Sequence, residues 1–416
     1  MLGFGLGYKE EESSLFLLFM AGMNPARRGE LNAMRNIRKF VAPEIVFGEG
    51  TTELLGRYAA NFGANRVLVV TDSGMVKVGL ANRAVDILRS AGVEAIVYDR
   101  VSPNPRDHEV MAGAALYHQA TCDVIVALGG GSPMDCAKGI SVVSVNGANI
   151  LDFEGVDKVG APGPPLICIP TTAGSSADVS QFAIINNVHD QVKVAIISKT
   201  VVPDVALIDP ATTLTMDRYL TLCTGVDALV HAVEAYVSSA SSDLTDLHAL
   251  EAIRLLHRYL PEVLDRLDDL WLRGRIMLAS LEAGLAFSNA SLGAVHAMAH
   301  SLGGLLDLPH GECNALLLDH VVAFNYSAAP ERYDRIGEIF GACLTGLTEQ
   351  EKRRAIIDSL RTFKEQLGLQ PGLAKRGVRR EDVGVLARKA IADPCMATNP
   401  RRAQVADIEA IYMEAF

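Results

Sequence analysis

The sequence feature that most restricts the fold is a series of short apolar runs that alternate with helical patterns. Three runs occupy residues 66–71, 94–98 and 123–128, and the helical patterns between them end at residue 91 and span residues 107–120. The third run is continuous in apolar residues, which is typical of a strand in a parallel sheet covered on both faces. This alternation predicts parallel βαβ units.

Two loops rich in small residues follow predicted strands. The third run ends in three glycines, residues 129–131, followed by Ser132 and Pro133, and a strand over residues 165–169 ends in the loop 170–178. Glycines let a backbone approach a ligand closely, and the free N–H groups at a helix start attract phosphate. Ligands of open α/β sheets bind at the carboxyl ends of strands. The two loops therefore predict one nucleotide pocket, although no Gly-x-Gly-x-x-Gly fingerprint is present and a plain strand–helix connection is the alternative for the first loop.

Asp72 follows the end of the first run. A carboxylate at this place can accept hydrogen bonds from a ribose diol, and a 2′-phosphate there would be repelled. The alternative is an ordinary turn residue or helix N-cap.

A change of pattern marks the predicted domain boundary. After residues 201–210 the strand patterns stop, and helical periodicity continues almost to Phe416. Its predicted breaks are Gly293, Gly303-Gly304, Pro330 and Pro371. With the boundary near residues 210–214, we expect a nucleotide-binding α/β domain over residues 34–212 and an all-helical domain over residues 213–416.

Residues 1–33 are set apart from this fold. Their apolar run, residues 15–23, is too short to span a membrane. It follows a lysine and three glutamates at residues 9–12, which is the wrong charge for a signal peptide. We expect an N-terminal extension that is either disordered or the product of a mis-assigned start.

Three of the ten histidines lie in the apolar, small-residue stretch 284–310. His296 and His300 are four residues apart and share one face of a helix. His310 follows a proline after the Gly-Gly pair, which suggests a turn that returns a third imidazole to that face. Buried imidazoles need partners, and these are either a metal ion or backbone carbonyls.

A second pair with helical spacing supports the metal interpretation. Asp227 and His231 are four residues apart in another apolar helical pattern. One carboxylate with three imidazoles suits Fe²⁺ or Zn²⁺. Glu234, one turn further on, either supports a ligand or simply faces solvent.

Composition excludes several other classes of protein. The net charge is −11 and no stripe of Lys and Arg is interleaved with aromatic residues, so we expect no nucleic-acid partner. We expect no membrane partner either. The seven scattered cysteines contain no Cys-x-x-Cys pair, which fits a reducing cytoplasm and argues against a thiolate zinc site.

Several linked motifs resemble those of the iron-containing (group III) alcohol dehydrogenase family from about residue 38 to the end. They are residues 129–133 with Asp135 and Lys138, residues 171–174, residues 225–228 with His231, residues 284–311 and residues 399–401. The resemblance implies a dehydroquinate synthase-like fold, with an α/β N-terminal domain and an all-α C-terminal domain around the metal. It also implies a cytoplasmic homodimer or higher homo-oligomer.

The resemblance carries over to individual positions. Asp227, His231, His296 and His310 match the family's metal ligands. His300 matches a cleft histidine near nicotinamide and substrate that is not a ligand, and Phe287 matches a residue that lines the substrate pocket. The positions that match cofactor contacts are Asp72, Asn104, Gly130, Gly131, Ser132, Thr171, Thr172, Ser180 and Lys193.

The implied function is reversible hydride transfer between a primary alcohol and NAD, which yields the aldehyde and depends on Fe²⁺ or Zn²⁺. The ion acts as a Lewis acid toward the alcohol oxygen. His300 is either a proton relay or a residue that only positions the substrate.

One departure from the family pattern leaves a second function open. Family members usually continue Thr-Thr-Ala-Gly with a Thr-Gly-Ser-Glu-type run, whereas residues 175–182 here read Ser-Ser-Ala-Asp-Val-Ser-Gln-Phe. This change is expected to alter the wall near the nicotinamide. It resembles a branch that includes proteins implicated in regulating ethanol oxidation, so the alternative is a regulator or sensor with weak or no turnover. A lyase similar to dehydroquinate synthase needs several basic residues near the ligands, and few are present.

Overall fold

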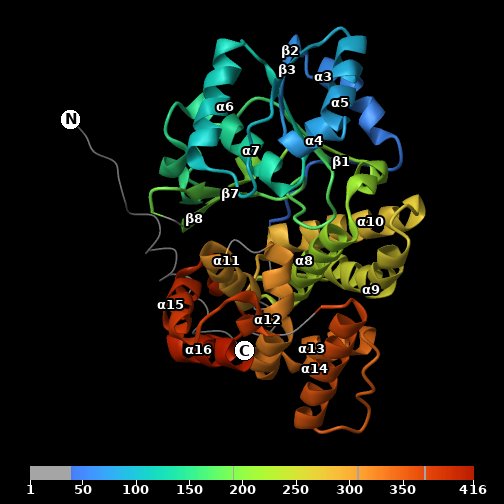
Figure 1. The fold of residues 1–416 in the computed structure, drawn as a ribbon, viewed down its shortest axis with the longest axis vertical. Helices are drawn as coiled ribbons and strands as arrows, with labels where there is room; N and C mark the ends of the chain where they lie inside the picture. Colours follow the sequence, from blue (N-terminus) through green and yellow to red (C-terminus); the bar gives the residue numbers. More distant parts are fainter. Residues whose placement is uncertain (1–38, 191, 307–308, 370–371) are drawn as a thin grey trace, which may run out of the picture. The chain divides into compact units, whose positions relative to one another are not determined.

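The protein is described by a computed structural model over residues 39–190, 192–306, 309–369 and 372–416. The predicted N-terminal extension, residues 1–33, lies outside these ranges. Within residues 41–416, Figure 1 shows the strands in the blue to green part of the chain and a series of helices, α8 to α16, in the remainder. The predicted combination of an α/β part and an all-helical part is confirmed.

Six parallel strands form the main sheet in the order β1-β9-β6-β4-β2-β3. They are β1 (Glu44–Phe47), β2 (Arg66–Val70), β3 (Glu94–Tyr98), β4 (Val124–Gly129), β6 (Leu166–Pro170) and β9 (Val205–Ile208). Side chains along β2 alternate between two buried clusters, with Leu68 and Val70 in one and Val67 and Val69 in the other. Because both faces of the sheet are covered, its strands carry continuous apolar sequence.

In the described residues, five helices accompany the sheet: α3 (Leu55–Asn61), α4 (Ser73–Lys77), α5 (Leu80–Ser90), α6 (Asp107–Gln119) and α7 (Gly131–Asn146). Residues of α3 and α5 pack in one of the two clusters, and residues of α6 and α7 pack in the other. The helical pattern predicted to end at residue 91 is two helices rather than one. Gly79, with φ of 85°, separates α4 from α5, since this backbone conformation cannot continue a right-handed helix.

A small second sheet contains β5 (Gly155–Val156), β7 (Phe182–Asn187) and β8 (Val192–Ile197). Strands β7 and β8 pair antiparallel, and alternate residues of β7 are buried. The sequence interpretation did not identify this hairpin. One predicted cofactor position, Lys193, lies on β8, and another, Ser180, precedes β7.

Nine helices follow the sheet in the described part of the chain. They are α8 (Arg218–Val237), α9 (Asp243–Asp265), α10 (Leu270–Ala290), α11 (Ala294–Leu306), α12 (His310–Asn325), α13 (Pro330–Ile339), α14 (Glu349–Gln366), α15 (Val383–Ala392) and α16 (Val405–Glu414). The predicted break at Gly303-Gly304 is wrong, because α11 continues through both glycines to Leu306. Helix propensity is a weak prior, and tertiary packing commonly overrides it. The predicted break at Pro371 lies outside the described residues.

Helix α8 is long and apolar enough to cross a membrane by length and composition, but 89% of its most apolar window is buried inside the fold. This burial is what a core helix shows. The last strand of the main sheet ends at Ile208, and α8 begins at Arg218. We therefore keep the boundary at residues 210–214 as a proposal, with residues 34–212 and 213–416 as the two domains.

The strand order places two predicted loops next to each other. Strand β3 lies on one side of β2 and β4 lies on the other, so the direction of winding reverses between β2 and β4. Ligands of such sheets bind outside the strand ends at this reversal. Asp72 follows β2 and Gly130 follows β4, so both occupy this edge of the sheet.

The loop after β6 contacts the helical part. A Cβ on Gly174 would lie 2.7 Å from the carbonyl oxygen of Thr224 on α8, and one on Gly284 of α10 would lie 2.4 Å from Cβ of Ser176. Only glycine permits backbones to approach this closely. The contact brings the strand-end loops near the helices that carry Asp227 and the histidines.

Candidate functional site: a metal centre beside a nucleotide cleft

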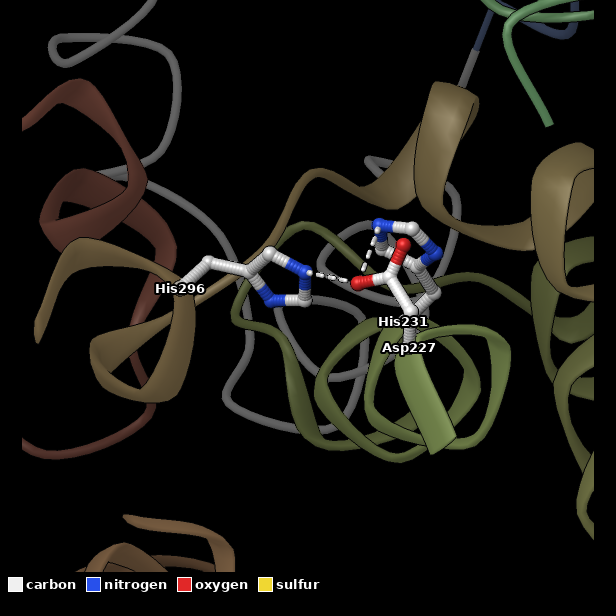
Figure 2. A group of neighbouring side chains, drawn as sticks. All are labelled: Asp227, His231 and His296. Carbon is white, nitrogen blue, oxygen red and sulfur yellow. Dashed lines mark ion pairs between the residues drawn. The ribbon is translucent and has the colours of Figure 1, made fainter. Parts of the chain in front are cut away.

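Three of the four predicted metal ligands, Asp227, His231 and His296, have ligand atoms within 4.8 Å of one another, and the fourth, His310, lies outside this group although it approaches Asp227. Asp227 and His231 come from consecutive turns of α8, His296 comes from α11, and His310 is the first residue of α12. The Nε2 atoms of His231, His296 and His310 lie 3.9, 3.7 and 3.8 Å from Oδ1 of Asp227. Figure 2 shows the Asp227 carboxylate between the imidazoles of His231 and His296.

This donor set fits a borderline divalent ion. One carboxylate and three imidazoles suit Fe²⁺ and Zn²⁺. Two ligand atoms that each lie about 2.1 Å from one tetrahedral ion are roughly 3.4 Å apart. The observed separations of 3.7 to 3.9 Å from Asp227 are close to that spacing. These distances support Asp227, His231 and His296 as ligands of one ion, and we propose His310, which approaches the same oxygen of Asp227, as the fourth.

Burial sets the protonation of the imidazoles. It lowers the pKa of His231 to about 4, against the opposing charge of Asp227, and it lowers the pKa of His310 well below its ordinary value. Burial also opposes a charge on His296, but hydrogen bonds with Asp227 and Glu234 raise its pKa to about 9. Two imidazoles are therefore neutral near pH 7, and the third must release its proton to bind a metal.

Glu234 contacts a proposed ligand, His296, rather than facing solvent. It is buried, and its Oε2 lies 2.6 Å from Nδ1 of His296. The same carboxylate accepts the backbone N–H groups of Gly293 and Val295 at 3.0 and 2.6 Å. A carboxylate on the far nitrogen of a ligating histidine fixes the tautomer and direction of the ring. Glu234 therefore directs Nε2 of His296 toward Asp227.

Asn314 is a neighbour of the site that the sequence interpretation missed. Its fully buried amide donates from Nδ2 to Oδ1 of Asp227 at 2.8 Å and lies 3.3 Å from Nε2 of His296. The available signal was spacing, because Asn314 is four residues after His310 and shares its helix face.

His300 lies beside the four-residue cluster rather than within it. Its ring stacks on that of His310, with centroids 5.0 Å apart and an angle of 14°. Its Nδ1 lies 2.8 Å from Oδ2 of Asp393. No local pattern could connect these two residues, which are 93 positions apart.

Aromatic side chains cover one side of His231. The ring of Phe287 stacks on it at 4.3 Å, and the ring of Phe182 lies 5.9 Å from Phe287. The preceding residue, Gln181, donates its backbone N–H to Oγ of Ser288 on α10 at 3.1 Å. The unusual Gln-Phe pair thus ties the hairpin to α10 and extends the apolar wall around Phe287.

Asp72 is a helix N-cap, and its position leaves the proposed contact with a ribose open. Its Oδ1 accepts the N–H groups of Gly74 and Met75 at 2.7 and 3.1 Å, so it is the N-cap of α4. A Cβ on Gly129 would lie 3.4 Å from its Oδ2. The second oxygen therefore faces the glycine-rich loop, where a ribose is expected.

All the remaining cofactor positions except Ser180 fall into two groups near the strand-end loops. A Cβ on Gly130 would lie 3.2 Å from Thr172, and one on Gly131 would lie 2.9 Å from Ser175. The N–H of Thr171 donates to the carbonyl of Gly129 at 2.9 Å. Because Gly130 and Gly131 have no side chains, the glycine loop lies directly against the side chains of Thr172 and Ser175. We expect the N–H groups at the start of α7 to contact the phosphate.

The second group contains Asn104, Ser132 and Lys193. The N–H of Asn104 donates to Oγ of Ser132 at 3.1 Å, and Lys193 Nζ donates to Oδ1 of Asn104 at 2.8 Å. Asn104 has φ of 58°, a conformation that asparagine tolerates better than most residues. The charge of Lys193 also acts on His310, which places this group close to the metal centre.

Lys138 holds the last predicted position, Ser180. It is fully buried, and its Nζ donates to the carbonyl of Ser180 at 2.8 Å, to Oγ of Ser180 at 3.1 Å and to the carbonyl of Phe182 at 2.7 Å. One ammonium group thus fixes both the Ser180 backbone and the start of β7.

Lys138→Met is expected to loosen this loop while keeping the side-chain length. Two backbone carbonyls lose their donor, and each unpaired buried acceptor costs about 1–3 kcal/mol, so the free energy of unfolding should fall by about 2–6 kcal/mol. NADH affinity should fall as well, because Ser180 loses its support. Urea unfolding and a fluorescence titration with NADH measure the two effects, with Lys199→Met on an exposed lysine as the control. Unchanged NADH affinity would show that Lys138 acts on stability alone.

Strand-end loops beside an Asp–His cluster point to a nucleotide- and metal-dependent enzyme, and sequence comparison specifies which kind. The family model described as iron-containing alcohol dehydrogenase matches residues 42–210. The model for the C-terminal part of the Fe-containing alcohol dehydrogenase family matches residues 221–416. The chain therefore belongs to the iron-containing alcohol dehydrogenase family, as its motifs indicated.

Relatives match over most of their length. The NAD-dependent methanol dehydrogenase of Bacillus methanolicus is 36% identical over 376 residues, covering 90% of this chain and 99% of that protein. Alcohol dehydrogenase 4 of Schizosaccharomyces pombe is 40% identical over 370 residues, covering 89% of this chain and 87% of that protein. The crystal structure of a 1,3-propanediol oxidoreductase has a TM-score of 0.89 and 37% identity, covering 91% of this chain and 100% of that one. These relatives are named as enzymes and give no support to the regulatory alternative.

Proposed function

We propose that the protein interconverts a small primary alcohol and its aldehyde, with NAD as the hydride carrier and one Fe²⁺ or Zn²⁺ ion at Asp227, His231, His296 and His310. The observation that carries the proposal is the convergence of three imidazole nitrogens within 3.9 Å of one carboxylate oxygen. This cluster adjoins the loops that follow β4 and β6. The family assignment supports the same reaction.

A bound divalent ion supplies Lewis acidity toward an alcohol oxygen. The protein's own groups supply position and exclusion of water. Phe287 covers His231 and leaves an apolar surface for the carbon chain of the alcohol, while the strand-end loops orient the nicotinamide half of the cofactor. Correct orientation of two reactants is worth several orders of magnitude in rate.

The substrate class follows from the wall beside the cluster. Phe182 and Phe287 are apolar and closely packed, which favours a short, unbranched alcohol over a bulky or charged one. The names of two relatives, a methanol dehydrogenase and a 1,3-propanediol oxidoreductase, agree with small primary alcohols. The same resemblance leads us to expect a homo-oligomer in the cytoplasm.

The proposal is tested by anaerobic NADH formation. Protein purified without oxygen and loaded with Fe²⁺ or Zn²⁺ is given NAD⁺ and ethanol, butanol or 1,3-propanediol, and absorbance follows NADH. We expect metal-dependent turnover that a chelator removes. Metal-loaded protein that binds NADH but turns over no alcohol or aldehyde would contradict the proposal and favour the regulatory alternative.

Asp72→Ser is expected to change cofactor choice without loss of the fold. Serine caps a helix about as well as aspartate, so thermal stability should change little. A hydrogen bond to a charged group is worth about 1.5–3 kcal/mol, so KM for NAD⁺ should rise roughly 10- to 100-fold. Discrimination against NADP⁺ should also weaken. Kinetics with both cofactors measure the change, and Asp86→Ser on the exposed face of α5 is the control. An unchanged ratio of the two KM values would assign Asp72 to capping alone.

A further inference from the structure

Asp393 and His300 form a fixed pair beside the metal centre. Asp393 precedes a short 3₁₀ segment, Pro394–Thr398, and its Oδ1 accepts the backbone N–H of Cys395 at 2.8 Å. Its Oδ2 lies 2.8 Å from Nδ1 of His300. Both oxygens of the carboxylate are therefore engaged, each with a different partner.

The pairing determines which nitrogen of His300 carries the proton. An ionised carboxylate only accepts hydrogen bonds, so Nδ1 must be the donor. In the neutral ring Nε2 is then the acceptor. Among the residues that the structure describes, no group hydrogen-bonds this Nε2. The stacking of the ring on His310 fixes its plane.

We propose that Asp393 is a positioning residue that holds His300 in the tautomer with the proton on Nδ1, so that Nε2 is ready to accept the hydroxyl proton of the alcohol. This inference rests on the proposed function. As the alcohol is oxidised, its O–H proton passes to Nε2 of His300 and the O–H electron pair stays on oxygen. The carbinol hydrogen leaves as hydride and reduces NAD⁺. In the reverse direction the same nitrogen returns the proton to the aldehyde oxygen.

A second metal site is the competing interpretation of this group. Ligand atoms of His300, Asp393 and Cys395 lie within 4.8 Å of one another. A thiolate would be the strongest ligand among them, but burial raises the pKa of Cys395 well above its ordinary value. A thiol that stays protonated is a poor metal ligand. The direct Asp393–His300 hydrogen bond therefore gives the better account of the geometry.

Two substitutions at Asp393 separate positioning from packing. In Asp393→Asn the N–H of Cys395 still requires an acceptor, so the amide oxygen stays on it and the NH₂ group turns toward His300. Nδ1 must then accept, and the proton moves to Nε2. Asp393→Ala forces neither tautomer. If Asp393 positions His300, the asparagine variant should lose more activity than the alanine variant. If Asp393 only fills space, the alanine variant should lose more.

The tautomer is read directly by nitrogen NMR of zinc-loaded protein labelled with ¹⁵N-histidine, with His300→Gln assigning the signal. We expect the proton on Nδ1 in the parent protein and on Nε2 in Asp393→Asn. An unchanged tautomer in Asp393→Asn would overturn the inference. Two zinc ions per chain with a ligated His300 would also overturn it. The tautomer measurement does not depend on turnover. A parent protein that is inactive would contradict the proposed function, while the tautomer of His300 would still decide the role of Asp393.

Kinetics provide the second readout. Proton transfer by a positioned side chain contributes typically about 100- to 10,000-fold, so kcat for Asp393→Asn should fall at least about 100-fold with KM for NAD⁺ unchanged. The fall in kcat should be smaller for Asp393→Ala. Asp190→Asn is the matched control, because Asp190 lies 2.8 Å from Nδ1 of the exposed His189. Greater activity in Asp393→Asn than in Asp393→Ala would overturn the inference.

Discussion

Asp227→Asn is expected to abolish stoichiometric metal binding and, with it, alcohol oxidation. The change keeps the size of the side chain and removes the only negative charge among the four proposed ligands. Its Oδ1 is also the atom that three imidazole nitrogens approach within 3.9 Å. Loss of a supporting partner alone costs roughly 10- to 100-fold in metal affinity, and loss of a ligand should cost more.

Metal content and NADH formation measure this effect in parallel. The control is Asp246→Asn, which removes a carboxylate on α9 that is paired with Arg332 away from the site. The control should keep one ion per chain and the parent turnover. If Asp227→Asn retained one tightly bound ion, the proposed ligand set would be wrong.

Glu234→Gln is expected to weaken metal binding by roughly 10- to 100-fold without removing a ligand. Glu234 accepts hydrogen bonds from Nδ1 of His296 and from the backbone at Gly293 and Val295. A glutamine has one oxygen for these donors, and its NH₂ group faces one of them. The ring of His296 therefore loses the partner that directs its Nε2, and the free energy of unfolding should fall by about 1–3 kcal/mol per unpaired donor.

Glu282→Gln is the matched control, because Glu282 lies 2.5 Å from Nδ1 of His248, a pair formed away from the metal centre. Chelator competition gives the metal affinity, and urea unfolding of the metal-free protein gives the stability. The expected result is a loss of affinity for Glu234→Gln alone. Equal affinities in the two variants would assign Glu234 to the folding of α11 and not to the orientation of His296.

Sequence pattern predicted the parts of the fold that depend on periodicity. The strand at residues 123–128 was visible because both faces of the sheet are buried, and the Asp227–His231 pair was visible because helix spacing places them on one face. The β7–β8 hairpin was missed because its strands are only half buried. The break at Gly303-Gly304 was wrongly predicted, since glycine propensity is weaker than the packing of α11.

The site residues that could be predicted were likewise those with regular spacing in the sequence or a match to family motifs. His296 and His310 were identified by spacing and by resemblance to a family, whereas the role of Glu234 stayed open until its burial was known. Asp393 could not be identified at all. Its partner His300 lies 93 residues earlier in the chain, and only the three-dimensional fold brings the two together.

The most direct test is anomalous diffraction from crystals of the iron-loaded protein grown without oxygen. We predict one strong peak per chain, within about 2.0–2.2 Å of Oδ1 of Asp227 and of the Nε2 atoms of His231, His296 and His310. A peak elsewhere, or an ion that His310 or Asp227 does not contact, would contradict the proposed centre.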